Sequence, residues 1–128
     1  MDYTKWEFHN SKPIYKQLYQ RLLIDILSEK LMPGECIPSI RIMASTLRIN
    51  ANTVARVYKL LLKDGLIQTT GGKSRVADVF FIQEKRKQEA QRLCTNYINA
   101  MMKLGFSREE TVSFVSEYEQ SSMGGHSL

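Results

Sequence analysis

The segment from Ser39 to Gly65 contains two short amphipathic helical patterns separated by a tight turn. In the second pattern apolar residues recur at i, i+3, i+4, i+7 and i+8, the stripe of a helix that packs on a core. This stripe consists of Val54, Val57, Tyr58, Leu61 and Leu62, and the opposite side carries Asn52, Arg56, Lys59 and Lys63. In the first pattern the expected buried residues are Ile40, Met43, Ala44 and Leu47, with Arg41 and Arg48 outside. Two helices, a short turn and a basic second helix predict a DNA-reading helix-turn-helix.

An aromatic arm and a longer helix precede this segment. Trp6 and Phe8 stand among polar residues in the arm, residues 1–12, and we expect the two rings to hold it down. Pro13 suits a first helical turn, and apolar residues then recur every four positions to about Lys30. We expect this helix to pack across the helix-turn-helix, whose two helices have Ser39 and Asn50 as N-caps.

Two short extended runs, residues 66–70 and 75–80, follow the basic helix. Gly65 is expected to end that helix in a left-handed conformation, and residues 71–74 to form the tip of a hairpin. A hairpin directly after a helix-turn-helix is the wing of a winged helix, where Lys73 and Arg75 can meet phosphates or the minor groove. The sequence therefore predicts a winged helix-turn-helix over residues 13–80.

Residues 81–121 predict two further helices. The first covers about residues 84–104, and the second opens with a Ser107–Glu110 capping box and ends near Gln120. The pair carries more apolar surface than it can hide from water, so we expect a second copy of the chain to cover it; folding back on the winged helix is the alternative. The expected dimer residues are Leu93, Tyr97, Ile98, Met101, Met102, Val112 and Val115. Residues 122–128 are expected to form a flexible tail. The expected fold class is mainly α, with a small β-hairpin wing.

Basic charge is concentrated where DNA would lie. No Asp or Glu occurs between Cys36 and Lys63, although an ordinary solvated helix face mixes both signs. The whole net charge of +5 falls within residues 1–80, because basic and acidic residues balance after Phe80. Phosphate contacts with such a surface release counterions and supply most of the non-specific affinity.

Composition limits the remaining function classes. The chain has 128 residues, 43% of them apolar, but no run of about 18 apolar residues, so we expect no membrane span, no secretory signal and a cytoplasmic location. Cys36 and Cys94 lack metal-ligand spacing and are expected to be reduced thiols; no metal or cofactor is expected. His9 and His126 lie in expected flexible ends, and Glu109 and Glu110 offset a helix dipole, so no enzyme is expected. A winged helix that binds protein instead of DNA remains the alternative, although it would not need the acid-free basic stretch.

Residues 13–77 resemble the N-terminal winged helix of the GntR superfamily of bacterial transcription regulators. The matching pieces are P-I-Y-x-Q at residues 13–17, L-x-P-G-x-x-I-P-S-x-R at 31–41, N-x-N-T-V-x-R-x-Y at 50–58 and D-G-L-I at 64–67. The aromatic arm, the N-x-N-T-V variant and a C-terminal part of only two helices are similar to the YtrA subfamily.

This resemblance implies a homodimeric regulator, usually a repressor, that binds double-stranded DNA at a two-fold symmetric operator, often of a transporter operon. It assigns DNA contacts to Ser39, Arg41, Asn50, Asn52, Thr53, Arg56 and Gly72, with Lys73 beside them. Lys59 is expected to add a phosphate contact from the same basic helix. Arg41 suits guanine or a phosphate, Asn52 an adenine edge, and Thr53 a phosphate or a thymine methyl group. No small-molecule effector site can be placed.

Overall fold

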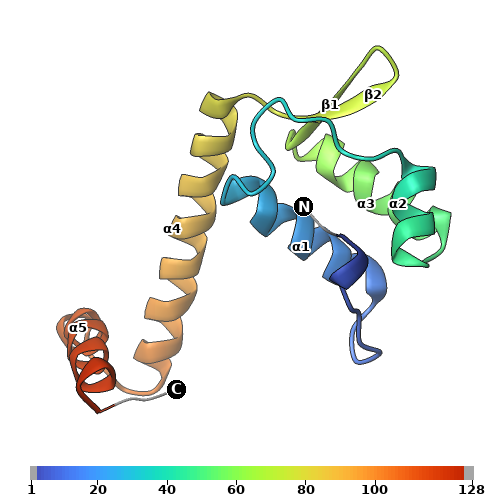
Figure 1. Ribbon diagram of the computed structural model, residues 1–128. Helices are drawn as coiled ribbons and strands as arrows, with labels where there is room; N and C mark the ends of the chain where they lie inside the picture. Colours follow the sequence, from blue (N-terminus) through green and yellow to red (C-terminus); the bar gives the residue numbers. More distant parts are fainter. Residues whose placement is uncertain (1–2, 126–128) are drawn as a thin grey trace. The chain divides into compact units, whose positions relative to one another are not determined.

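The computed structural model describes residues 3–125, drawn in Figure 1. The elements are a 3-10 turn η1 (Tyr3–Lys5), α1 (Ile14–Leu27), α2 (Ile40–Leu47), α3 (Ala51–Lys63), β1 (Ile67–Thr70), β2 (Lys73–Val76), α4 (Val79–Lys103) and α5 (Arg108–Gly125). This mainly helical fold with one antiparallel hairpin confirms the predicted fold class. Two compact units divide the chain, one up to Arg86 and the other from Lys87. Within residues 3–125, no helix has the length and apolarity needed to cross a membrane.

The core of the first unit lies where α1 packs on α3. The side chains without exposed surface in this contact are Leu18, Leu22, Ile26, Val54, Val57 and Leu61. Trp6 belongs to the same cluster and Phe8 packs against it, as predicted for the arm. Burying one large apolar side chain contributes about 1.5–3 kcal/mol, so two rings suffice to hold a short arm.

The predicted helix caps are confirmed. Ser39 Oγ accepts a hydrogen bond from Ile42 N at 3.2 Å, and Asn50 Oδ1 accepts one from Asn52 N at 2.7 Å. Each cap satisfies an amide that would otherwise lack a partner in the first turn, which is worth about 1 kcal/mol. The two helices of the helix-turn-helix therefore begin where the sequence placed them.

The wing departs from the predicted hairpin in its second strand. Its tip consists of Gly71 and Gly72 alone, with φ of 61° and 79°, so that Thr70 pairs with Lys73. Two adjacent glycines supply the positive φ angles that a two-residue hairpin turn requires, which shortens the loop. Strand β2 therefore begins at Lys73, within the predicted tip, and it ends at Val76, so the prediction of a strand to Phe80 is wrong.

The long helix α4 begins at Val79, earlier than the predicted residue 84. Asp78 Oδ1 accepts a hydrogen bond from Phe81 N at 3.0 Å and caps this helix. Capping by an Asp stabilises a helix start and overrides the extended preference of the following apolar residues.

Two residues assigned to buried stripes are exposed. Ile40 is 37% exposed and Leu62 is 42% exposed. Ile40 is the first residue of α2, and Leu62 lies at the edge of the α3 stripe. An apolar stripe on a helix contacts the core over little more than about 100°, so residues at its ends and margins stay outside.

The second unit is a hairpin of α4 and α5. Ser107 and Glu110 form the predicted capping box, with reciprocal hydrogen bonds of 2.9 and 3.1 Å. Tyr97 Oη donates to the main-chain oxygen of Thr111 at 2.9 Å and joins the two helices. Helix α5 continues to Gly125 instead of ending near Gln120, and residues 126–128 of the expected tail lie outside the described residues.

Candidate nucleic-acid interface

A tight turn joins the two helices of the helix-turn-helix. Arg48 ends α2 with φ of 57°, in the left-handed region, and Ile49 N donates to Ala44 O at 3.1 Å. This closure leaves one further residue, Asn50, before α3 begins. The chain therefore reverses within three residues, and the start of α3 is held close to the end of α2.

Helix α3 presents polar and basic side chains on its exposed side. Asn52, Arg56 and Lys59 are exposed and follow one another at i, i+4 and i+7, so they share one face. Thr53 is half-buried beside this face, and Asn50 is exposed at its start. The structure thus brings together the residues of α3 that the sequence analysis named.

The start of α2 adds a second group. Ser39 and Arg41 are both exposed, and the Ser39 hydroxyl oxygen already accepts the capping hydrogen bond from Ile42 N. The hydroxyl proton of Ser39 remains able to donate outward. Arg41 carries five donors in a planar fork, a shape that matches a phosphate or a guanine edge.

The wing has an unpredicted third segment at its side. Residues 34–37 pair with β2 through Gly34 N to Val76 O and Ile37 N to Ser74 O, both 2.9 Å. Arg75 donates from Nη1 to Gly34 O at 3.3 Å, and its exposed side chain keeps further donors for the expected DNA contact. Gly72 and Lys73 are exposed at the tip, where the sequence analysis placed a DNA contact.

Arg56 stacks on an aromatic ring that the sequence analysis did not connect with DNA. Its guanidinium carbon lies 3.6 Å from the centre of the Tyr15 ring of α1. Tyr15 is half-buried and packs against the core, whereas Arg56 is exposed. The sequence does show two aromatic residues four positions apart in the α1 stripe, Tyr15 and Tyr19. It does not show which side chains of α3 they contact.

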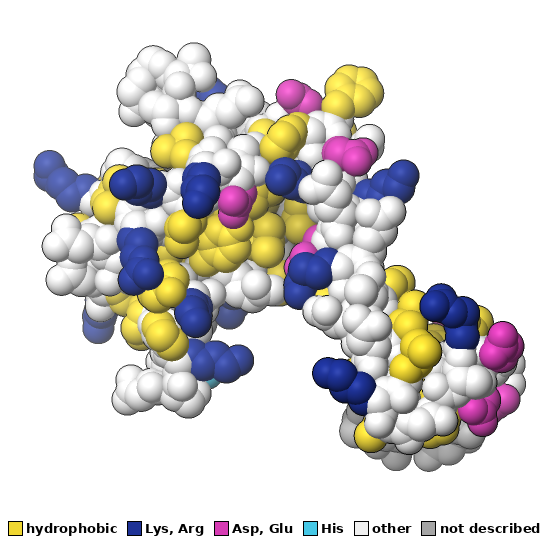
Figure 2. Space-filling view, turned by 180° about the vertical axis from the view of Figure 1, so that it is seen from behind, with side chains coloured by type: hydrophobic (Ala, Val, Ile, Leu, Met, Phe, Trp, Pro, Cys, Tyr) yellow, Lys and Arg dark blue, Asp and Glu magenta, His cyan; other side chains and the backbone are white. Residues whose placement is uncertain are grey.

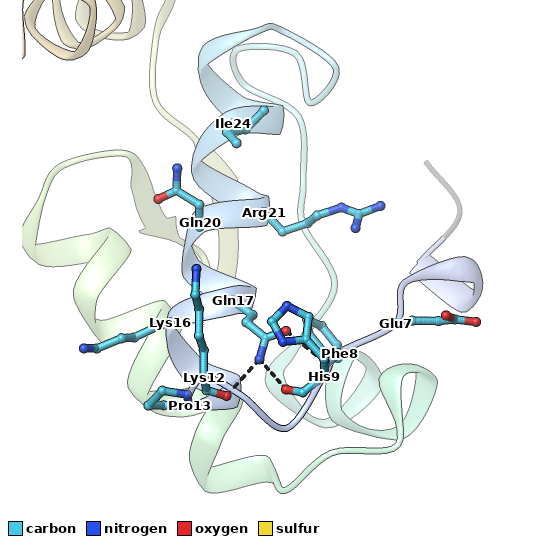
Figure 3. A pocket seen from close by; sticks show the side chains of 10 residues that line it. All are labelled: Glu7, Phe8, His9, Lys12, Pro13, Lys16, Gln17, Gln20, Arg21 and Ile24. Atoms are coloured by element: carbon cyan, nitrogen blue, oxygen red, sulfur yellow. Dashed lines mark hydrogen bonds between the residues drawn. The ribbon is translucent and has the colours of Figure 1, made fainter. Parts of the chain in front are cut away.

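The N-terminal arm lies against α1 and borders an open groove of about 850 Å³ (Figure 3). Gln17 Nε2 donates to His9 O at 2.7 Å and to Lys12 O at 2.9 Å, while Gln17 Oε1 accepts from His9 N at 3.1 Å. Arg21 covers the ring of Trp6 with its guanidinium carbon 4.7 Å from the ring centre. One glutamine thus fastens the arm to α1 through both of its amide atoms.

Burial affects the ionisation of Tyr58, a core residue of α3. Desolvation first, and the nearby Tyr3 second, raise the pKa of Tyr58 above its ordinary value of 10.0. The hydroxyl therefore stays protonated, and acts as a donor, to a higher pH than an exposed tyrosine would.

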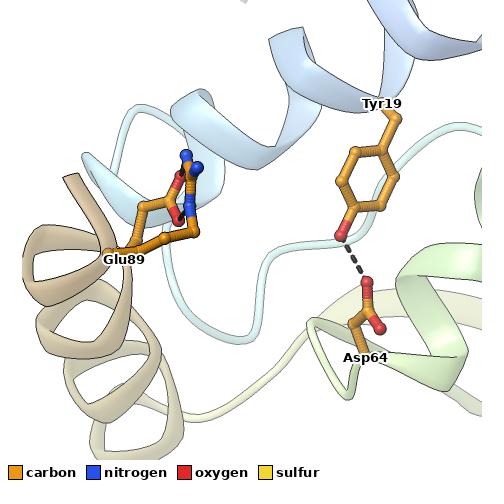
Figure 4. A network of polar contacts seen from close by, with 4 residues as sticks. Tyr19, Asp64 and Glu89 are labelled. Carbon is orange, nitrogen blue, oxygen red and sulfur yellow. Dashed lines mark hydrogen bonds and ion pairs between the residues drawn. The ribbon is translucent and has the colours of Figure 1, made fainter. Parts of the chain in front are cut away.

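The predicted dimer residues are partly exposed in the second unit. Tyr97, Ile98 and Met101 are half-buried, and the four exposed ones are Leu93, Met102, Val112 and Val115. Leu104 and Tyr118 add further exposed apolar surface to this unit. On α4, Arg92 donates two hydrogen bonds to the Glu89 carboxylate, of 2.6 and 2.8 Å. This contact with Arg92 holds the pKa of Glu89, which Figure 4 labels, below its usual range.

The described residues contain no cluster of three His, Cys, Asp or Glu side chains able to hold a metal ion. His9 Nδ1 lies 2.6 Å from Ser11 Oγ, and His126 lies outside the part of the chain that the structure describes. On the face drawn in Figure 2, Lys and Arg side chains surround an area of apolar side chains.

Comparison with known protein families places the same unit among regulators. Residues 14–76 match the family described as bacterial regulatory proteins, gntR family. The matched range covers α1, both helices of the helix-turn-helix and the wing, which are the elements that carry the basic face.

The chain is also similar to individual transcription regulators in sequence and structure. The chain is 28% identical to the HTH-type transcriptional regulator YhcF of Bacillus subtilis (strain 168) over 116 residues, 89% of this chain and 96% of that protein. It is 38% identical to the HTH-type transcriptional repressor YtrA of the same bacterium over 64 residues, 50% of this chain and 49% of YtrA. A GntR family transcriptional regulator from Listeria monocytogenes has a similar structure, with a TM-score of 0.75 and 29% identity over 86% of this chain and 98% of that chain.

Proposed function

Since this protein is a DNA-binding transcription regulator with a helix-turn-helix domain of the gntR family, we propose that it acts as a homodimeric repressor on a two-fold symmetric operator. The observation that carries the proposal is the acid-free exposed face formed by Arg41, Arg56 and Lys59 on α2 and α3. Such a face supplies phosphate contacts from two helices held at a fixed angle by one turn.

The contacts divide by chemistry. Arg41 and Asn52 have the planar donor and acceptor groups that read base edges, whereas Lys59, Lys73 and Ser39 suit phosphates. The Asn50 side-chain oxygen accepts the capping hydrogen bond of α3, and the side-chain NH₂ group remains able to donate to DNA. The remaining contacts in this proposal are Thr53 and Arg56 from α3 and Gly72 from the wing tip.

The exposed apolar side chains of α4 and α5 support the homodimer. Leu93, Val112 and Val115 are each more than half exposed, at 56%, 65% and 51%. A patch of this kind on a small unit marks an interaction surface, and two-fold dimers are the commonest assembly. A dimer would also set two recognition helices about one helical turn of DNA apart, which matches a palindromic operator.

The repressor assignment rests on the likeness to the B. subtilis repressor YtrA, which covers the DNA-binding half of the chain. We also propose a cytoplasmic location, where a bacterial regulator meets its DNA. We propose that the operator lies ahead of a transporter operon, as the YtrA-like resemblance implies.

The test is in vitro selection of DNA from a random library by the purified full-length chain, followed by fluorescence anisotropy on the selected duplex and on a shuffled duplex across a salt series. The proposal expects an enriched two-fold repeat, bound roughly 10³-fold or more tightly than the shuffled duplex. Sedimentation should give two chains per duplex. A library without any enriched sequence, or one chain per duplex, would contradict it.

Repression itself needs a separate assay. A reporter gene downstream of the selected duplex should be expressed less when the chain is co-produced. Increased expression would make the protein an activator at that site.

A further inference from the structure

The stack of Arg56 on Tyr15 joins the recognition helix to a helix outside the helix-turn-helix. The guanidinium carbon of Arg56 is 3.6 Å from the ring centre, close enough for a strong cation–π contact. Asn52 and Lys59 lie on the same exposed face of α3, one turn to either side of Arg56. The stack therefore sits in the middle of the proposed DNA-binding face.

Stacking changes what an exposed arginine can do. A free arginine side chain carries about 2 kcal/mol of rotamer entropy, which it loses when it makes a directional contact. A ring beneath the guanidinium restricts that motion before DNA arrives, and it leaves the N–H donors at the edge of the plane available. Preorganised donors of this kind favour one geometry of contact over others.

The turn of α1 that carries Tyr15 makes two further sets of contacts. Gln17, two residues further along α1, fastens the N-terminal arm through His9 and Lys12. One helical turn beyond Tyr15, the Tyr19 hydroxyl donates to Asp64 Oδ2 at the end of α3 (Figure 4). Beside the apolar core, two side-chain contacts therefore join α1 to α3, one between Tyr15 and Arg56 and the other between Tyr19 and Asp64.

We propose that Tyr15 is a positioning residue for sequence-specific binding, because its ring holds the Arg56 guanidinium where the operator requires it. This inference rests on the proposed function, since it needs an operator that the protein prefers over other DNA. On unselected DNA the contacts are loose, and an unsupported Arg56 can still find a phosphate.

The experiment compares Tyr15→Leu and Tyr15→Phe on the selected duplex and on the shuffled duplex, with the full-length chain. Tyr15→Leu should weaken binding to the selected duplex roughly 3- to 10-fold and to the shuffled duplex less than about 2-fold. Tyr15→Phe keeps the ring and should bind both duplexes as the wild type does. Arg56→Gln removes the charge and should weaken both, lowering the salt slope by about 1.

A double-mutant cycle separates positioning from a direct contact. Once Arg56→Gln has removed the guanidinium, adding Tyr15→Leu should change affinity for the selected duplex less than about 1.5-fold. The matched control is Tyr19→Leu, one turn along the same stripe, which disturbs the same helix pair but not the ring under Arg56. It should lower stability without reducing preference for the selected duplex.

Three results would overturn the inference while leaving the proposed function intact. In the first, Tyr15→Leu lowers the affinity for both duplexes equally. In the second, Tyr15→Phe loses affinity. In the third, Tyr15→Leu lowers affinity as much in the Arg56→Gln background as in the wild type. If selection enriches no sequence, the proposed function fails first and takes the inference with it.

Discussion

Tyr58 Oη donates a hydrogen bond to the main-chain oxygen of Pro38, 2.7 Å away, and thereby ties α3 to the loop that opens α2. Tyr58 is almost fully buried, and Pro38 immediately precedes the Ser39 cap. The start of α2, which carries Arg41, is therefore positioned by a side chain from the recognition helix and not by its own cap alone.

Replacing Tyr58 by Phe should lower the free energy of unfolding by about 1–2 kcal/mol, because the partly buried carbonyl of Pro38 loses its donor. Urea denaturation measures this change. The control is Tyr118→Phe, which removes a hydroxyl from a side chain that is 65% exposed and should change stability little. Equal stability of Tyr58→Phe and wild type would mean that water replaces the hydroxyl.

Alkaline pH should destabilise the protein through the same residue. Burial raises the pKa of Tyr58 above 10.0, so the folded state keeps this proton more tightly than the unfolded chain does. The resulting stability is fully present below about pH 10 and is lost as the pH rises through the raised folded value. Unfolding measured between about pH 8 and 11 should show a decline of up to about 1.4 kcal/mol per pH unit from this group. Tyr58→Phe should decline less steeply above pH 10, and parallel curves would contradict the assignment.

Arg41 and Lys59 should differ in their effects on DNA binding. Arg41→Ala should cost about 1–3 kcal/mol on the selected duplex and little on the shuffled one if Arg41 reads a base. Lys59→Ala should weaken both duplexes alike and reduce the salt slope by about 1. Anisotropy titrations at several salt concentrations check both, and identical behaviour of the two variants would remove the division of roles.

Gly65 should not tolerate a side chain. Its φ is 75°, and an added Cβ would lie 2.5 Å from Cζ of Phe81. The strained backbone of Gly65→Ala should therefore lower the free energy of unfolding by about 1–3 kcal/mol, and displacement of the Phe81 ring should lower it further. Gly34→Ala is the matched control, because Gly34 has φ of 82° with open space around the added Cβ. Urea denaturation that gives the same loss for both variants would mean that Phe81 moves aside freely.

A charge added to the apolar stripe of α4 should disrupt the proposed dimer. Leu93→Glu should shift the chain to monomers in sedimentation, since a carboxylate in an apolar interface must be desolvated. Asn99→Glu adds the same charge on α4 but away from the apolar stripe of Leu93, Tyr97 and Met101, and it should leave the dimer intact. A Leu93→Glu chain that stays dimeric would place the interface elsewhere.

The wing contains a pairing that no local sequence pattern indicates. Gly71 and Gly72 marked a turn, but the pairing of residues 34–37 with β2 joins segments more than thirty positions apart. Neither segment carries a local signal for the other. For the same reason the hydrogen bond from Arg75 to Gly34 O could not be predicted from the sequence.

By itself the sequence determined which segments are helical, the Ser39 and Asn50 caps, the helix-turn-helix and its acid-free face, because periodicity and capping act over three or four residues. It did not determine where α4 begins or where α5 ends. The tertiary structure decided that Tyr15 lies beneath Arg56, that Tyr58 holds Pro38 and that Ile40 is exposed. These depend on how α1, α2 and α3 pack against one another. Packing brings together residues whose spacing along the chain carries no record of their contact.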